Sequence, residues 1–301
     1  SGAVLEGLRN YLPEESILLQ EPMAGHTTFR VGGPADCLLQ PENEEQLKSV
    51  QKYLQAVGIP WFAAGNGSNL LVSDQGYSGA ILQIGQKMSR IGVDDCVLRV
   101  QSGASMAQAA RAALEHGLTG LEFASGIPGT VGGGVVMNAG AYGGEMSRVV
   151  EQVSVIDCHG ESMELQNETM EFRYRSSVIR NNPFIVTEVV FSLQRGDREQ
   201  TGNTREELAA RRREKQPLEY PSAGSTFKRP EGNFAGKLIM DAGLGGFQIG
   251  GARVSDKHCG FIINAGGATA RDIREVIARV QEQVKDRFHV QLEPEIVFLG
   301  F

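Results

Sequence analysis

The chain has 301 residues and a formal net charge of −7 at pH 7, from 29 Lys and Arg against 36 Asp and Glu. Its length suits about two domains with sizeable cores, and its acidic balance gives no global field for nucleic acid or anionic lipid. The four cysteines match no zinc-site spacing, and no segment approaches a membrane span or a signal peptide. We therefore expect a cytoplasmic protein with free thiols that handles small molecules, without metal, nucleic-acid or membrane partners.

The first predicted elements are a helix and three short strands. Apolar residues recur at helical spacing over 43–57, and the sequence Gly-Ile-Pro then stops the helix. Strands are expected at 61–63, 70–72 and 80–84. The pattern changes character near residue 85, which we interpret as a domain boundary.

The next stretch mixes strands with one helix. That helix has a capping-box start, in which Ser105 and Gln108 stand three residues apart, and a glycine at its end. The sequence predicts strand 97–101, helix 105–116, and strands 149–157 and 184–193. This pattern indicates an α+β domain over residues 85–203.

A third unit begins at residue 204. Thr204 and Glu207 have the spacing of a second capping box, which predicts a helix over 204–215. A long amphipathic helix is expected at 269–288, followed by a closing strand at 296–299.

Two glycine-rich segments interrupt these elements. The first cradle, residues 65–72, reads GNGSNLLV, and the second cradle, residues 124–144, reads ASGIPGTVGGGVVMNAGAYGG. Successive N–H groups in such turns form a concavity for phosphate oxygens, and glycine permits close backbone approach. A single glycine-rich loop is more often an ordinary turn. Two of them, each beside an apolar run, predict a cradle for a long phosphorylated ligand.

The familiar nucleotide fingerprints fail on spacing. The sixth position of a G-x-G-x-x-G motif in the first cradle is Leu70, and no helix follows. The nearest approach to a Walker A loop, residues 232–238, is one residue short between its glycines and ends in Leu238, where magnesium binding needs Ser or Thr. Neither classical nucleotide-binding fold is supported.

Three polar clusters lie outside the cradles, at residues 172–177, 223–230 and 292–295. An arginine in a closed site can bind a carboxylate bidentately, a serine beside glycine can present its hydroxyl, and a buried glutamate can share a proton. Each has an ordinary alternative, since such a serine is more often a turn or cap residue and such a glutamate an edge charge. The five histidines do not cluster and no G-x-S-x-G motif is present, which disfavours hydrolysis.

Taken together, ordered blocks along the whole chain resemble the UDP-N-acetylenolpyruvoylglucosamine reductase family. The glycine cradles alone would indicate only the wider vanillyl-alcohol-oxidase-like superfamily of FAD-binding proteins, whereas the AGSTFK and LEPE blocks select the reductases. The blocks are TTFRVGG (27–33), GNGSNLL (65–71), GIPGTVGG (126–133), NAGAYG (138–143), YRSS (174–177), AGSTFK (223–228), GFQIGGA (246–252) and LEPE (292–295).

The resemblance implies an α+β protein of three domains. Residues 1–84, completed by 289–301, and residues 85–203 would form a two-domain FAD-binding unit of the vanillyl-alcohol-oxidase-like (PCMH-type) superfamily. Residues 204–288 would form a substrate-binding α+β domain. In this family NADPH reduces the flavin, whose N5 then gives hydride to the enolpyruvyl methylene carbon of UDP-N-acetylglucosamine enolpyruvate. The product is UDP-N-acetylmuramate, a peptidoglycan precursor, and no obligate protein partner is implied.

The resemblance also assigns residues. Non-covalent FAD would be held mainly by the two cradles, and the implied contacts are Arg30, Gly65, Asn66, Gly67, Ser68, Asn69, Leu70, Ser125, Gly126, Ile127, Pro128, Gly129, Thr130, Gly132, Gly133, Asn138, Ala139, Gly140 and Ile185. Ser225 would protonate the carbon beside the substrate carboxylate. Arg175 and Glu295 would stabilise the enol-like intermediate, with Glu295 protonated or paired with Arg175. The substrate would be bound by Tyr174, Lys215, Arg229 and Gln248.

One departure separates two branches of the family. Residues 175–183 read RSSVIRNNP, too short for the inserted tyrosine-bearing loop with which one branch covers its substrate. The chain is similar to the other branch. Another FAD-dependent oxidoreductase or oxidase on the same scaffold is the alternative enzyme, and a nucleotide-sugar sensor would lack the reactive groups that are present here.

Overall fold

The computed structural model describes residues 2–301, and their contacts group into two compact units. Both units mix helices with antiparallel and parallel strands, so the α+β fold class is confirmed. The boundaries of the three predicted domains stay a prediction. Unit 1 comprises residues up to Leu18, Cys37–Gly65 and Gly79–Arg211, and unit 2 comprises Leu19–Asp36, Asn66–Ser78 and Arg212–Phe301.

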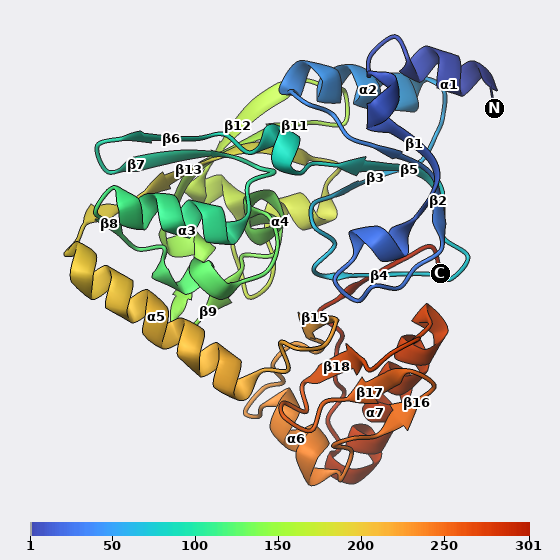
Figure 1. The fold of residues 1–301 in the computed structure, drawn as a ribbon, viewed down its shortest axis with the longest axis vertical. Helices are drawn as coiled ribbons and strands as arrows, with labels where there is room; N and C mark the ends of the chain where they lie inside the picture. Colours follow the sequence, from blue (N-terminus) through green and yellow to red (C-terminus); the bar gives the residue numbers. More distant parts are fainter. Residues whose placement is uncertain (1) are drawn as a thin grey trace. The chain divides into compact units, whose positions relative to one another are not determined.

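The largest sheet of unit 1 has five antiparallel strands in the order β12-β11-β13-β7-β6. Helices α3 (Met106–Glu115) and α4 (Val131–Val136) lie together on one face of it (Figure 1). Leu98 and Val100 alternate with more exposed residues along β7, and they are fully buried in the core between sheet and helices. The strands are β6 (Ile91–Asp94), β7 (Val97–Gln101), β11 (Val150–Ile156), β12 (Ser162–Gln166) and β13 (Ile185–Ser192).

A second sheet has the strand order β1-β2-β5-β3, and β3 pairs in parallel with β5. Helix α2 (Glu44–Ala56) packs Leu47, Val50 and Leu54 into a core that belongs to unit 1, together with α1 (Gly2–Leu8). The side chain of Asn43 caps α2 by accepting the Gln46 amide. The strands are β1 (Ile17–Pro22), β2 (Pro34–Leu39), β3 (Trp61–Ala64) and β5 (Tyr77–Gln83).

Unit 2 is built on an antiparallel sheet in the order β15-β18-β17-β16. Helix α7 (Ala270–Phe288) packs its apolar stripe on this sheet beside α6 (Ala235–Asp241). The carboxylate of Asp74 accepts the amides of Ala270 (2.8 Å) and Arg271 (3.0 Å), which satisfies two free N–H groups of the first turn of α7. The strands are β15 (Ser222–Ser225), β16 (Gln248–Ile249), β17 (Ala252–Val254) and β18 (Phe261–Asn264).

A short parallel pair joins distant parts of the sequence within unit 2. Strand β4 (Leu70–Val72) pairs with β19 (Val297–Leu299), with Leu70 opposite Val297. Parallel strands need a crossover connection, and here more than two hundred residues separate them. This pair confirms both predicted strands, and β4 forms the last three residues of the first cradle.

Most of the strongly patterned elements are confirmed, with ends that differ by at most three residues. Helix 105–116 is α3 with its capping box, and helix 269–288 is α7, capped by Thr269 and Asp272. Strands 80–84, 149–157 and 184–193 correspond to β5, β11 and β13. The remaining short elements are strands Leu118–Thr119, Gly140–Ala141, Gly144–Glu145 and Gln194–Arg195, and the 3₁₀ helices Glu14–Ser16, Met23–His26, Gln86–Met88, Glu122–Gly126, Met146–Arg148, Asn167–Met170 and Val178–Asn181.

The predicted start of the helix at Thr204 is wrong. Helix α5 spans Arg198–Lys215, and the Asp197 carboxylate accepts the Gln200 amide at 2.9 Å as its N-terminal cap. Thr204 and Glu207 therefore lie inside the helix, where a capping-box spacing has no meaning. Asp197 is an equally good cap residue, and it is the one that precedes the first helical turn.

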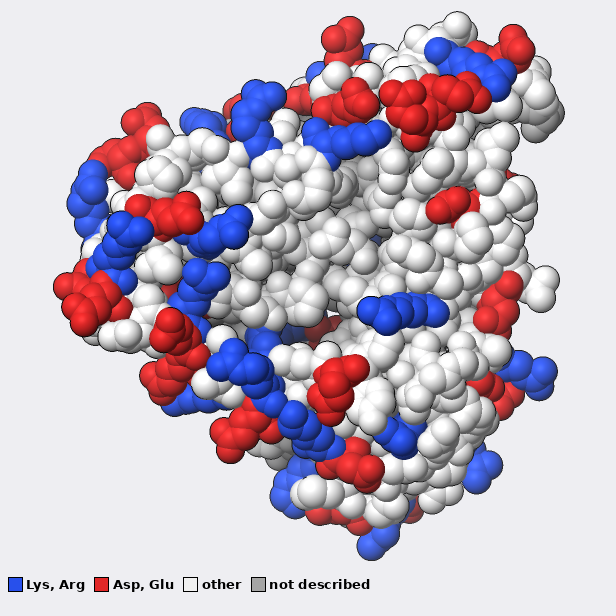
Figure 2. Space-filling model, viewed as in Figure 1, with Lys and Arg blue, Asp and Glu red and all other residues white. Residues whose placement is uncertain are grey.

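The surface carries both signs of charge. Figure 2 shows Lys and Arg interspersed with Asp and Glu over the visible face. The four cysteines are free. Across residues 2–301, no helix combines the length and apolarity needed to cross a membrane, and no group of His, Cys, Asp and Glu has an arrangement able to hold a metal ion.

Candidate active site

The second cradle approaches a neighbouring turn through glycine. The Gly132 N–H donates to the Ser102 carbonyl at 3.0 Å, and a Cβ on Gly132 would stand 2.9 Å from the Ser102 Cβ. Part of the cradle forms α4, a glycine-rich helical turn that the sequence did not predict, with Thr130 accepting the Gly133 amide at 3.2 Å. The glycines are therefore needed for close approach, as the sequence indicated.

Ser102 is a candidate site residue that the sequence analysis does not identify. Its side chain is 2% exposed, and among residues 2–301 its hydroxyl has no hydrogen-bond partner. A buried hydroxyl without a partner costs about 1–3 kcal/mol, and a polar ligand in the cradle would supply the partner. Only the hydrogen bond between Gly132 and Ser102, which a single sequence does not contain, identifies Ser102.

The two cradles meet within unit 1. A Cβ on Gly65, the first residue of the first cradle, would overlap the side chain of Thr130 in the second. The two segments are therefore in close contact there, with the backbone of one against a side chain of the other. The sequence predicted this cooperation only from the similar composition of the two segments.

The rest of the first cradle lies in unit 2. The Gly67 carbonyl accepts the Thr28 amide at 3.2 Å, and Gly67 has a φ of +64°. Asn69 donates its side-chain N–H to the Glu295 carbonyl at 3.1 Å, and its own carbonyl accepts the Val297 amide at 2.9 Å. The cradle is thereby fixed to the segment that contains one of the predicted catalytic residues.

Arg175 is anchored to the second cradle. Its guanidinium donates to the carbonyls of Gly140 (3.0 Å) and Asn138 (3.4 Å) and lies 5.1 Å from the ring centroid of Tyr174. Arg175 has a φ of +49°, in a turn closed by Arg173 and Ser176. Left-handed backbone at a residue other than glycine is strained and requires support from its surroundings. A permanent cation is thus held at the edge of the cradle.

Ser225 and Glu295 are brought together in unit 2, although 70 positions separate them in the sequence. The Glu295 amide donates to the carbonyl of Thr226, the next residue after Ser225, at 2.8 Å. An isolated bridge between Phe227 and Pro294 continues this contact. The AGSTFK and LEPE blocks are therefore neighbouring extended segments, and Ser225 itself is exposed.

Several other predicted cofactor residues have roles inside the protein. Ser125 donates its hydroxyl to the Glu122 carbonyl, and the Asn138 amide donates to Arg173 and accepts from Ser147. Ile185 is 1% exposed and packs in the core with α2. Their contact with a cofactor stays a prediction.

The predicted substrate residues lie on exposed or partly exposed positions. Tyr174 is half exposed, and Lys215 ends α5. The Arg229 guanidinium lies 4.9 Å from the ring centroid of Phe234, while Gln248 donates to the Gly250 carbonyl at 2.8 Å. Each is available at the surface of its unit, and its substrate contact stays a prediction.

Two titratable groups lie in the loop between β17 and β18. Burial and the nearby Asp256 carboxylate raise the pKa of the Cys259 thiol, and burial lowers the pKa of the His258 imidazole. Both groups are therefore neutral near pH 7, and Cys259 has the environment of an unreactive thiol.

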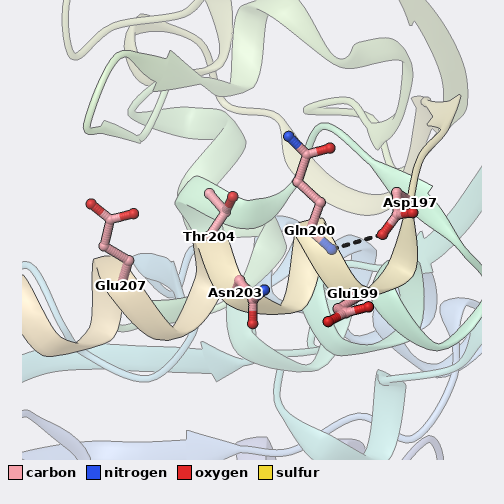
Figure 3. Close-up of a pocket in the computed structure, with 6 residues that line it drawn as sticks. All are labelled: Asp197, Glu199, Gln200, Asn203, Thr204 and Glu207. Atoms are coloured by element: carbon pink, nitrogen blue, oxygen red, sulfur yellow. Dashed lines mark hydrogen bonds between the residues drawn. The ribbon is translucent and has the colours of Figure 1, made fainter.

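A shallow polar depression on α5 is unrelated to the cradles. Figure 3 shows its side chains projecting from successive turns of the helix without converging on one point. All of them are exposed, and they share no apolar wall that would select a small molecule. The residues are Asp197, Glu199, Gln200, Asn203, Thr204 and Glu207.

Comparisons with known proteins agree with this geometry. Residues 35–166 match a family described as an FAD binding domain, and residues 216–299 match the UDP-N-acetylenolpyruvoylglucosamine reductase C-terminal domain. A UDP-N-acetylenolpyruvoylglucosamine reductase of Caldanaerobacter subterraneus subsp. tengcongensis is 49% identical over 99% of this chain and 98% of the relative. The crystal structure of the reductase from Thermus caldophilus has a TM-score of 0.80 at 35% identity, covering 94% of this chain and 98% of that one.

The wider fold is shared with other proteins. A grass pollen allergen, Phl p 4, described as having glucose dehydrogenase activity, matches with a TM-score of 0.51 at 16% identity, over 65% of this chain and 44% of that one. That likeness concerns the fold alone.

Fold and cradles define a flavoprotein oxidoreductase of the FAD-binding α+β class. Within that class, the full-length match is specific. The chain belongs to the UDP-N-acetylenolpyruvoylglucosamine reductase family.

Proposed function

We propose that this protein reduces UDP-N-acetylglucosamine enolpyruvate to UDP-N-acetylmuramate at the expense of NADPH, through bound FAD. The observation that carries the proposal is the pairing of the Ser225 and Glu295 segments directly beside Asn69 of the first cradle. The backbone segments that carry Ser225 and Glu295 thus lie next to the first cradle. This neighbourhood supports their proposed roles as proton donor and carboxyl group in the reduction of an enolpyruvyl group.

The residues of the two cradles fit FAD. Glycines 65, 67 and 132 make approaches that a Cβ would block, and the buried Ser102 hydroxyl can donate to a ligand oxygen. Backbone N–H groups of the cradles would hold the pyrophosphate, with Arg30 and the Ser125–Gly140 segment completing the contacts. When bound, FAD supplies hydride transfer from NADPH to the substrate methylene carbon.

The chain itself supplies charge and protons. Ser225 would give its hydroxyl proton to the carbon that bears the substrate carboxylate, and solvent would then replace that proton. Arg175 would bind the carboxylate and stabilise its enol-like form, since a guanidinium can donate two parallel hydrogen bonds to a carboxylate. Glu295 would act in its protonated form or paired with a cation, because a bare carboxylate would repel an anionic intermediate. One hydride and one proton are thereby added across the double bond.

Binding of the nucleotide sugar would fall to Tyr174, Lys215, Arg229 and Gln248. All four are polar side chains at the surface of their units. A cytoplasmic location follows from the nature of the substrates, and the proposed reaction needs no protein partner.

The test is an anaerobic absorption experiment on the purified protein reconstituted with FAD. NADPH is expected to bleach the flavin band, and UDP-N-acetylglucosamine enolpyruvate to restore it. UDP-N-acetylglucosamine, which lacks the enolpyruvyl group, is the matched control and should restore nothing. Recovery with oxygen but not with the enolpyruvyl compound would contradict the proposal and support an oxidase. A protein that does not take up FAD would contradict the assignment of the cradles.

A further inference from the structure

His258 lies in a slot that two glycines make. A Cβ on Gly260 would stand 2.9 Å from the His258 Cε1, and a Cβ on Gly236 would stand 3.3 Å from the same atom. The ring also packs against Phe261, with 4.8 Å between centroids. Contacts shorter than about 3.4 Å are tighter than ordinary van der Waals contacts. A larger residue at either glycine would therefore displace the ring. The imidazole is therefore held in one orientation.

The Gly260 peptide connects this ring to the Ser225 segment. Its N–H donates to the His258 Nδ1 at 3.1 Å, and its carbonyl accepts the Thr226 amide at 2.8 Å. Ser225 is the residue before Thr226, and its Oγ stands 3.6 Å from the position of a Gly260 Cβ. The two hydrogen bonds thus run from the imidazole through one peptide unit to the backbone beside the Ser225 hydroxyl.

The hydrogen bond from the Gly260 N–H to the His258 Nδ1 can form only when Nδ1 carries no proton. Because Nδ1 accepts the Gly260 N–H, the neutral ring carries its proton on Nε2. A second proton on Nδ1 would face the Gly260 N–H, and two donors cannot bond to each other. Gly260 is buried, so its N–H would then lose its partner at a cost of about 1–3 kcal/mol.

Most of the charged side chains near His258 pair with one another or with other groups, and burial has the largest effect on the pKa of His258. Its own loop carries Asp256 and Lys257, and the Lys257 Nζ donates to the Arg213 carbonyl. On α6, Lys237 pairs with Asp241; after β15, Lys228 pairs with Glu293, and Arg229 stacks on Phe234. Burial lowers the pKa of His258 from its ordinary value, whereas its backbone hydrogen bonding raises it less.

We propose that His258 is a positioning residue for Ser225, acting through the Gly260 peptide and only as the neutral imidazole. The inference rests on the proposed function, in which Ser225 is the proton donor. It predicts a residue that affects proton delivery to the substrate without touching the cofactor or the substrate.

The consequence is an asymmetry between the two half-reactions. Oxidation of the reduced enzyme by substrate needs Ser225, so its rate should fall when acid protonates His258, below the ordinary titration range of histidine. Reduction of the flavin by NADPH does not need Ser225 and should lack this acid limb. General disruption of the fold would affect both half-reactions alike.

Two variants separate the hydrogen bond from the ring. His258→Asn places an amide oxygen near the position of Nδ1, so it can accept the Gly260 N–H and cannot titrate. His258→Leu fills part of the slot without an acceptor. We expect stopped-flow rates for the substrate half-reaction to fall about tenfold or more with leucine and less than about threefold with asparagine. The acid limb should disappear in the asparagine variant. His159→Asn, at an exposed turn position, is the control and should change nothing.

A readout independent of turnover is the imidazole ¹⁵N spectrum. We expect an acceptor-type Nδ1 signal for His258 at neutral pH, which is lost only at a pH below the ordinary titration range of histidine. An unchanged substrate half-reaction in the leucine variant, or an acid limb that survives in the asparagine variant, would overturn the proposal. If the leucine variant does not fold, the pH profiles of the wild type and the asparagine variant decide.

Failure of the proposed function gives a different result. If the wild-type reduced flavin is not reoxidised by the enolpyruvyl substrate at any pH, the reaction itself is wrong. If it is reoxidised and only the His258 comparisons fail, the proposed function stands without this positioning role.

Discussion

Arg175 of unit 1, the proposed cation, and Ser225 of unit 2, the proposed proton donor, are held in opposite ways. Arg175 is fixed through its side chain, which donates to two cradle carbonyls, and its backbone is strained. Ser225 is fixed through its backbone neighbours, since Thr226 bonds to both Gly260 and Glu295, while the serine side chain is exposed.

The difference follows from what each group is proposed to do. A cation that orients a carboxylate works best when its position is fixed. The two carbonyls occupy only some of the guanidinium N–H groups, so the others can donate to the ligand. A hydroxyl that gives up a proton and recovers it from solvent needs accessible surroundings, so only its starting position can be fixed. The three predictions below test this contrast.

Removal of the Ser225 hydroxyl should have the largest effect. In Ser225→Ala, the substrate half-reaction should slow by about 10²- to 10⁴-fold, the usual contribution of a positioned general acid, while NADPH reduces the flavin at the normal rate. Anaerobic stopped-flow absorption measures both steps. Ser222→Ala, at the start of the same strand, is the control. A normal substrate half-reaction in Ser225→Ala would show that the proton comes from elsewhere.

Replacement of Gly67 should destabilise the loop of the first cradle in unit 2 and lower the free energy of unfolding. In Gly67→Ala, the Cβ would overlap the His26 carbonyl and the φ of +64° would be strained, at a combined cost of about 2–4 kcal/mol. Chemical denaturation of the protein reconstituted with FAD measures the change in unfolding free energy. Gly25→Ala is the matched control, because a Cβ there meets nothing within 4 Å. Equal stability of the two variants would contradict the packing of this loop.

Loss of the forked side chain should have the smallest of the three effects. Arg175→Lys keeps the charge but cannot donate to both the Asn138 and Gly140 carbonyls in the same geometry. We expect the rate of the substrate half-reaction to fall by about 10- to 30-fold, equivalent to about one charged hydrogen bond. Arg173→Lys, at an exposed position in the same turn, should be near neutral. A larger loss in the Arg173 variant would mean that the wrong arginine was assigned.

Local signals predicted the elements that carry them. The capping box at Ser105 and the apolar stripe of α7 depend on neighbours three or four residues away, so one sequence contains all of the information. The sequence predicts that this helix starts at Thr204 from its spacing to Glu207, and only the Asp197 contact in the structure shows the earlier start of α5. Strands β1, β2 and β15 to β18 were not predicted, since short strands in mixed sheets have little periodicity of their own.

The candidate site also contains some features that local sequence predicts and others that depend on distant contacts. Composition was enough to indicate the two cradles, and the resemblance supplied roles for Arg175, Ser225 and Glu295. The orphaned hydroxyl of Ser102 and the slot of His258 depend on contacts between segments, so no local pattern contains them. The histidines do not cluster in the sequence, whereas the proposed role of His258 depends on its contacts with Gly236 and with the Gly260 peptide group.

The parallel pairing of β4 with β19 has a consequence for synthesis. Asn69 bonds to Glu295, a residue 226 positions later in the chain. At about 5–20 residues per second, a ribosome needs roughly 10–45 s to make that intervening length. During this interval the first cradle exists without the strand that fixes it, so the nascent chain cannot grip its cofactor in the final geometry. We therefore expect stable cofactor binding to follow synthesis of strand β19 rather than to accompany synthesis of the first cradle.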